Sequence, residues 1–213
     1  MEKNLAPTAE FKEKPDFYVF LDFDGVLYDL KSLGDNLPSF KDLFSEDKKL
    51  SLYSSDSIET INRLFDHLKT KYDVHLVISS FWRFFKTPLL IKWLESNGLD
   101  TTGITVDKTR ITAHPHKRGL EIKEFLQRHN NCNNLVILDD SYRENYLKHF
   151  LPQQIVTTNI FNDRLIAKKL DTSLKFYGLT PISTDEINKA NREQQTTIQP
   201  TKTVTISPSS MEL

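Results

Sequence analysis

The chain has 213 residues and a mass of 24.8 kDa, a length that accommodates one domain with extensions rather than two full domains. Its 28 Lys and Arg residues against 29 Asp and Glu residues give a net charge of -1, so no overall excess of positive charge is available for a nucleic-acid backbone. No stretch has the length of an apolar transmembrane segment, and residues 1–20 carry charges throughout, without the apolar core of a signal peptide. We therefore expect a cytoplasmic protein, or alternatively a secreted bacterial effector that acts in the cytosol of another cell.

Cysteine and glycine usage excludes several further classes. The single cysteine, Cys132, can form neither an internal disulfide nor a multi-cysteine metal site. The six glycines match neither the G-x-G-x-x-G spacing nor the P-loop spacing, which excludes dinucleotide and P-loop nucleotide chemistry.

Composition divides the chain into three parts. Residues 1–15 are rich in Lys and Glu and resemble a frayed arm, whereas residues 180–213 contain no aromatic residue and are dominated by Thr, Ser, Gln and Pro. A segment of that kind buries too little apolar surface to offset its ordering entropy. We expect a flexible N-terminal arm, a folded body over residues 16–179 and a polar flexible tail.

Within that body, short apolar runs alternate with segments of helical period, the pattern of βα units on a parallel sheet. In chain order, we expect strands at 17–21, 74–78, 104–106, 135–138 and 155–158, and helices from about 56, at 87–98, 119–129, 143–150 and 163–170. Asp56 and Glu59 have N-cap and N3 spacing for the first of these helices. The predicted fold class is α/β, a doubly wound, Rossmann-like parallel sheet with helices on both faces and the strands at 17–21 and 135–138 adjacent at its centre.

Polar residues follow the expected strands, at the sheet edge where open α/β sheets bind ligands. They are Asp22 and Asp24 after the first strand, Ser79 and Ser80 after the second, Lys117 and Arg118 before a helix, and Asp139 and Asp140 after the fourth strand. Singly, Asp and Ser at such positions also serve as turn and cap residues. Four carboxylates that meet without a cation repel one another strongly, and oxygen ligands without a thiolate cluster favour Mg²⁺.

The string Asp22-Phe-Asp24-Gly25-Val-Leu resembles the first motif of haloacid dehalogenase (HAD) superfamily phosphatases. In this resemblance Ser79 is the second-motif hydroxyl and Lys117 the third-motif cation, with Ser80 and Arg118 as alternatives for these two roles. The fourth-motif acids are Asp139 and Asp140. The strings 117–122, 136–140 and 79–83 are also similar to HAD domains grouped with RNA-repair proteins, and the whole resemblance covers about residues 17–140.

The resemblance implies a mechanism and a cofactor. Asp22 is the expected nucleophile, which forms an aspartyl-phosphate, and Asp24 the expected general acid and base. The Asp22 carboxylate, the Asp24 carbonyl and Asp139 are the expected Mg²⁺ ligands, with Asp140 as a further possible site residue. Ser79 and Lys117 are expected to bind the phosphoryl oxygens.

The inserts between the motifs are short. Residues 28–57 follow the first motif and residues 80–116 separate Ser79 from Lys117, so neither segment has room for a full cap domain once its helix and strand are subtracted. An open site favours a phosphate on a macromolecule, and we expect a phosphoprotein, with phosphotyrosine as a suitable aryl phosphate. The alternatives are a phosphatase for nucleic-acid ends and a non-catalytic phosphate-binding regulatory module.

Overall fold

The computed structural model of the chain describes residues 14–28, 54–111, 117–141, 143–159, 161 and 165–183. The expected arm up to residue 13, the first insert from 29 to 53 and the expected tail from 184 onward lie outside these residues.

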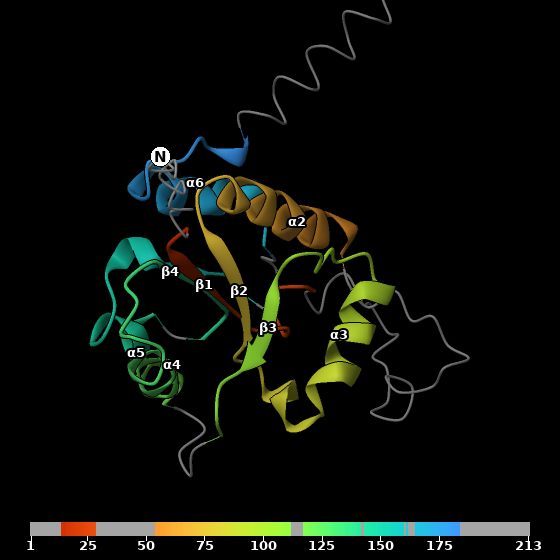
Figure 1. Ribbon diagram of the computed structural model, residues 1–213, viewed down its shortest axis with the longest axis horizontal. Helices are drawn as coiled ribbons and strands as arrows, with labels where there is room; N and C mark the ends of the chain where they lie inside the picture. Colours follow the sequence, from red (N-terminus) through yellow and green to blue (C-terminus); the bar gives the residue numbers. More distant parts are fainter. Residues whose placement is uncertain are drawn as a thin grey trace, which may run out of the picture.

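A five-stranded parallel sheet with strand order β3-β2-β1-β4-β5 forms the middle of the domain (Figure 1). The strands are β1 (Asp16–Leu21), β2 (Asp73–Ile78), β3 (Thr105–Lys108), β4 (Leu135–Asp139) and β5 (Ile155–Thr157). Strand β1 lies between β2 and β4, and its residue Leu21 is in register with Ile78 and with Leu138. The predicted α/β fold class and the adjacency of the first and fourth strands are confirmed.

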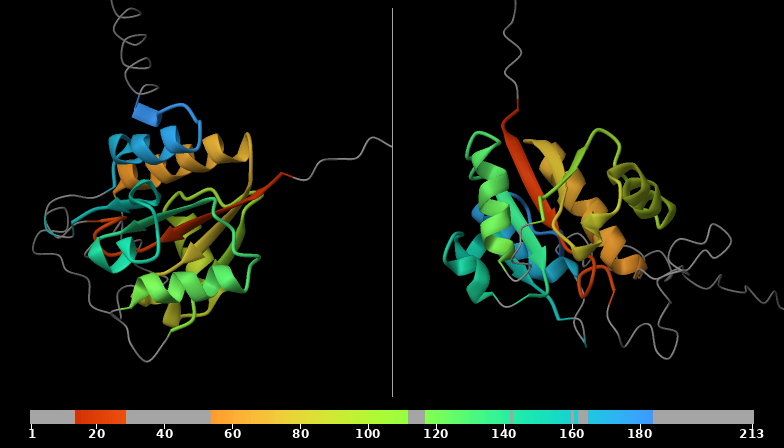
Figure 2. Two further views of the ribbon diagram at one scale, coloured as in Figure 1. Left: turned by 90° about the vertical axis from the view of Figure 1, so that its left-hand side faces the viewer. Right: turned by 90° about the horizontal axis from the view of Figure 1, so that it is seen from below.

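Helices cover both faces of this sheet, with α2 and α6 on one face and α4 on the other (Figure 2, left). The helices are α2 (Ser55–Lys69), α3 (Thr87–Ser96), α4 (Arg118–Gln127), α5 (Glu144–Leu147) and α6 (Ala167–Phe176), together with the 3₁₀ helices η2 (Phe81–Phe84) and η3 (Pro152–Gln154). Among the described helices, none combines the length and the apolar character that a membrane span requires.

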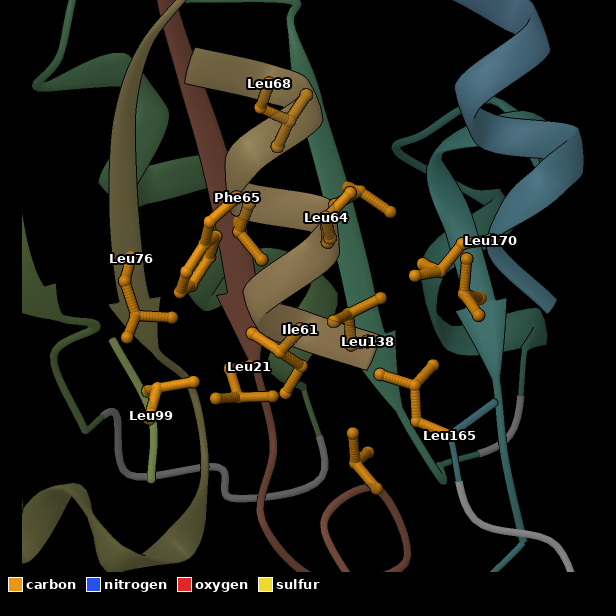
Figure 3. Close-up of a cluster of buried hydrophobic side chains, with 14 of the residues drawn as sticks. Leu21, Ile61, Leu64, Phe65, Leu68, Leu76, Leu99, Leu138, Leu165 and Leu170 are labelled. Atoms are coloured by element: carbon orange, nitrogen blue, oxygen red, sulfur yellow. The ribbon is translucent and has the colours of Figure 1, made fainter. Parts of the chain in front are cut away.

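The alternation of side chains along the strands divides the core into two layers. On β1, Phe17, Val19 and Leu21 belong to the cluster under α2, and Tyr18 and Phe20 belong to the cluster under α4. Figure 3 shows the first layer, in which the apolar stripe of α2 packs on the sheet; the labelled residues are Ile61, Leu64, Phe65 and Leu68 of α2 and Leu21, Leu76 and Leu138 of the strands. Because both faces of the central strands β1 and β4 are buried, these strands are near-continuous apolar runs, whereas the edge strand β3 is not.

Several local features differ from the sequence prediction; among them, η3 was not predicted and α5 is shorter than the expected helix at 143–150. The N-cap position of α2 is held by Ser54, whose side chain makes no cap hydrogen bond, rather than by Asp56, and η2 was not predicted. Helix α6 begins at Ala167, later than the expected start at 163, and continues to Phe176. The fully buried Leu165 donates its N–H to the carbonyl of Val26 at 3.1 Å, which fixes the chain against the loop after β1 before the helix begins.

Candidate active site

The site begins with two aspartates at the carboxyl ends of neighbouring strands. Asp22 follows β1 and Asp139 is the last residue of β4, and both are fully buried. The N–H of Asp22 donates to the carbonyl of Leu138 at 2.9 Å, so the parallel ladder continues up to the site. The two central strands therefore set the relative position of these two acids.

Asp140 joins them in a carboxylate cluster. Oxygens of Asp22, Asp139 and Asp140 all lie within 4.8 Å of one another. Backbone groups hold one oxygen of each buried acid, since Oδ1 of Asp22 accepts from the N–H of Phe23 and Oδ1 of Asp139 from that of Ser141, both at 2.8 Å. The Oδ2 atoms of both acids point to a common position, where they meet a cation of the protein itself.

The guanidinium of Arg118 is bound to this cluster. It donates to Oδ2 of Asp139 at 2.7 Å and to Oδ2 of Asp22. Lys117, which the sequence resemblance placed in this role, is the exposed N-cap residue of α4, and no side-chain cap hydrogen bond is formed there. The structure thus brings Arg118, rather than Lys117, to the acids.

The electrostatics of the cluster favour a cation. Burial raises the pKa of Asp22 well above its usual range, the negative charge of Asp139 raises it further, and Arg118 opposes both. Burial, followed by the charge of Asp139, raises the pKa of Asp140 to about 6. A set of three carboxylates with oxygen donors only fits a hard divalent ion such as Mg²⁺, which would stabilise the charged forms. The residues present therefore fit a metal of this class.

Gly25 allows Asp140 to approach the end of β1. Its φ is +70°, in the left-handed region that glycine adopts without strain. A Cβ atom at this position would lie 2.7 Å from Cβ of Asp140 and 2.8 Å from its Oδ2. The turn and the close approach both require the absence of a side chain.

Asp24 lies outside the carboxylate cluster and has its own partners. Its Oδ1 accepts hydrogen bonds from the indole Nε1 of Trp82 at 3.2 Å and from the hydroxyl of Tyr28. The sequence analysis missed the role of Trp82, because 58 residues separate it from Asp24 and no spacing indicates that η2 folds back over the first motif.

The two serines after β2 have different surroundings. The N–H of Ser79 donates to the carbonyl of Leu21 at 3.0 Å, which places Ser79 beside Asp22, and its buried Oγ has no hydrogen-bond partner within the described residues. Oγ of Ser80 accepts from the N–H of Trp82 at 3.3 Å and so caps η2. Because buried hydroxyls are nearly always hydrogen-bonded, the Ser79 hydroxyl is the better candidate to donate to a ligand oxygen.

Comparison with known proteins bears directly on this arrangement. A family model described as the HAD domain in Swiss Army Knife RNA repair proteins matches residues 18–163, more than half of the chain. The chain belongs to this family. Comparisons with curated proteins and with solved structures found no match. A HAD domain indicates phosphatase-type hydrolysis, and the matched range includes the whole carboxylate cluster.

A buried ion pair supports the second motif of this HAD domain. Arg83 of η2 and Glu121 of α4 are joined at 2.6 Å, with side chains 4% and 1% exposed. NH1 of Arg83 also donates to the carbonyls of Ser79 and Ser80, both at 2.7 Å. The pair ties the loop that carries Ser79 to the helix that carries Arg118. The sequence indicates this ion pair only through Glu121, which stands next to the apolar face of the predicted helix.

Proposed function

We propose that this HAD domain hydrolyses phosphomonoesters, with Asp22 as the nucleophile and Mg²⁺ as the cofactor. The observation that carries the proposal is the convergence of Asp22, Asp139 and Asp140 with Arg118 at the carboxyl ends of β1 and β4. This edge, where the strand order reverses, is where doubly wound sheets bind ligands.

The reaction proceeds in two displacements at phosphorus. In the first, an Asp22 oxygen bonds to phosphorus while the bond to the leaving oxygen breaks, and Asp24 gives that oxygen a proton. In the second, water attacks the aspartyl-phosphate, Asp24 takes the water proton, and the bond between Asp22 and phosphorus breaks. The hydrogen bonds from Tyr28 and Trp82 to Oδ1 of Asp24 orient this carboxyl group.

The other groups stabilise charge. Asp22, Asp139 and Asp140 would hold Mg²⁺ together with the backbone carbonyl of Asp24, and the bound ion would screen the repulsion between Asp22 and the phosphate dianion. The Ser79 hydroxyl donates to a phosphoryl oxygen, and the Arg118 guanidinium supplies fixed positive charge beside it. Lys117, exposed at the start of α4, adds positive charge at the rim of the site.

The substrate we propose is a phosphate at the end of a nucleic acid, because the matching family is described by its occurrence in RNA repair proteins. A phosphoprotein, with phosphotyrosine as its phosphorylated residue, is the second candidate. It is supported by the net charge of -1, which gives the chain no overall attraction to polyanions.

The test is phosphate release by the full chain from p-nitrophenyl phosphate, phosphotyrosine and phosphoserine peptides, and oligonucleotides with 3′ or 5′ phosphates. Each is assayed with Mg²⁺ and with EDTA. We expect turnover that requires Mg²⁺, falls to background in Asp22→Asn and persists in the control Asp66→Asn, which changes an exposed aspartate on α2. Turnover in Asp22→Asn equal to that of the wild type would refute the proposal.

A further inference from the structure

A shallow pocket lies at the carboxyl end of β3, and its other lining residues belong to η2 and to the C-terminal end of α4. The residues of its wall that matter here are Arg83, Phe84, Lys108, Thr109, Arg110 and Arg128. Arg83 is also the residue that binds the carbonyls of Ser79 and Ser80, so one side chain separates the pocket from the phosphate-binding loop. The pocket is therefore a neighbour of the catalytic site without being part of it.

Two of the lining residues carry a buried donor that lacks a hydrogen-bond partner among the described residues. Thr109 is 2% exposed and Arg83 is 4% exposed, and neither Oγ1 of Thr109 nor Nε of Arg83 has a hydrogen-bond partner within the described residues. An unsatisfied buried polar group costs about 1–3 kcal/mol. Both donor atoms lie beneath the surface of the pocket rather than on it.

An exposed aromatic pair stands at the mouth of the pocket. Phe81 and Phe84 lie on successive turns of η2, and their rings are in edge contact with centroids 4.8 Å apart. The two residues are 57% and 58% exposed and together form an exposed apolar patch. Exposed aromatic rings of this kind are the surfaces on which unpaired nucleobases stack.

The charge of the pocket is positive, in contrast to the near-neutral chain. Arg83 is neutralised by Glu121, which leaves Lys108, Arg110 and Arg128 against the single acid Asp107 among the lining residues. The ammonium of Lys108 is held by the carbonyls of Arg83 and Phe85 at 3.0 and 2.6 Å, so its charge is fixed at the wall. Arg110 and Arg128 are exposed and can reach a ligand.

We propose that this pocket binds the nucleotide adjacent to the terminal phosphate of a single-stranded nucleic acid. The base stacks on Phe81 and Phe84, and the adjoining phosphodiester lies against Arg110 and Arg128. Every nucleotide of a single strand offers a planar base beside a phosphate, whereas a peptide offers a planar ring only where an aromatic residue stands, so the combination favours a nucleic acid. This inference rests on the proposed function for the terminal phosphate, although the pocket can be tested by binding alone.

The experiment measures binding of a fluorescent, phosphate-ended single-stranded RNA to the full chain by anisotropy, in the Asp22→Asn background so that the phosphate is retained. The variants are Arg110→Glu with Arg128→Glu, and Phe81→Ala with Phe84→Ala. Matched controls on α6 are Lys168→Glu with Lys175→Glu, and Phe176→Ala, all at exposed positions. Phosphate release from the same RNA and from p-nitrophenyl phosphate is measured in the corresponding variants with Asp22 intact.

We expect each pocket double variant to weaken RNA binding by about tenfold or more, and the controls to change it by less than about twofold. In the variant Arg110→Glu with Arg128→Glu, the slope of log Kd against log salt concentration should fall by about 0.7 for each RNA phosphate that the protein no longer neutralises. Where phosphate is released, the ratio of kcat/KM for RNA to kcat/KM for p-nitrophenyl phosphate falls in parallel.

The outcomes separate the two proposals. The pocket inference would be overturned if the pocket variants bind RNA as tightly as the controls do. It would also be overturned if they weaken the binding of a phosphotyrosine peptide more than the binding of RNA. Both results count even if phosphatase activity is found. RNA binding that is lost in the pocket variants, with no phosphate release from any substrate, would support the pocket and overturn the proposed function.

Discussion

Removal of the Glu121 charge is expected to destabilise the protein and to impair catalysis. In Glu121→Gln the Arg83 guanidinium stays 4% exposed and loses its charged partner at 2.6 Å. Removal of one member of a buried ion pair leaves an uncompensated charge and costs about 3–5 kcal/mol. We expect a loss of this size in the free energy of unfolding, measured by urea denaturation in the presence of Mg²⁺.

Arg83→Met has a second consequence. It removes the side-chain donor for the carbonyl of Ser79, which costs about 1–3 kcal/mol more, whereas the carbonyl of Ser80 keeps the hydrogen bond from the backbone N–H of residue 83. The double variant Arg83→Met with Glu121→Met leaves no buried charge at these two positions. It should therefore lose less stability than the sum of the two single variants, by an interaction energy of about 1–3 kcal/mol.

The matched control is an exposed ion pair of the same length. Glu59 and Arg63 on α2 are also joined at 2.6 Å, but Glu59 is 58% exposed, so Glu59→Gln should cost less than about 0.5 kcal/mol. The reasoning fails if Glu121→Gln costs no more than Glu59→Gln, or if the two single losses add in the double variant.

Three further predictions concern the glycines and the carboxylates. Gly25→Ala should cost about 1–2 kcal/mol through the left-handed φ and should weaken Mg²⁺ binding, measured by calorimetry, because the new Cβ displaces Asp140. Gly119→Ala should lower stability in urea by about 1–2 kcal/mol despite the higher helix propensity of alanine, because its Cβ would lie 2.5 Å from the carbonyl oxygen of Asn145. In EDTA, the pKa values of Asp22 and Asp140 are raised in the folded state, so the folded state holds protons that the unfolded state has already released. The free energy of unfolding should therefore be highest below about pH 4. It should fall as the pH rises through about 6 and beyond.

Control variants separate the effects of the glycine substitutions and of carboxylate titration from general changes in stability. Thr172→Ala, at an exposed position of α6, tests helix propensity without a clash and should be neutral or slightly stabilising. Asp140→Asn should flatten the pH dependence in EDTA, and excess Mg²⁺ should reverse the loss at high pH. Equal pH profiles for wild type and Asp140→Asn, or a stabilising Gly119→Ala, would contradict the corresponding argument.

The fold was predictable because the local signals agreed with one another. The strands other than β3 are largely apolar runs followed by polar residues, and the helices between them carry an apolar stripe, so periodicity indicated the sheet and its crossovers. Prediction failed at Leu165, where a contact with the loop after β1 decides the start of α6, and at η2, which depends on a cap by Ser80. Both are contacts of the folded chain rather than of the local sequence.

The candidate site was predictable where residues sit at strand ends. Asp22, Asp139 and Asp140 follow directly from the parallel register of β1 and β4. The choice between Lys117 and Arg118 depends on which of two adjacent side chains turns inward at the start of α4, and spacing does not settle it. Trp82 and the pair of Arg83 and Glu121 depend on contacts between distant segments, which composition and periodicity do not reveal.

The most direct test of the central claim is to locate the phosphoryl group on the protein. A chain with Asp24→Asn is mixed with p-nitrophenyl phosphate and Mg²⁺, quenched in acid, and analysed by peptide mass spectrometry. Loss of the base for the second displacement should allow the intermediate to accumulate, and we expect an acid-stable, hydroxylamine-labile phosphoryl group on Asp22. Substrate turnover by the wild type with the phosphoryl group on another residue, or with none on Asp22, would contradict the account.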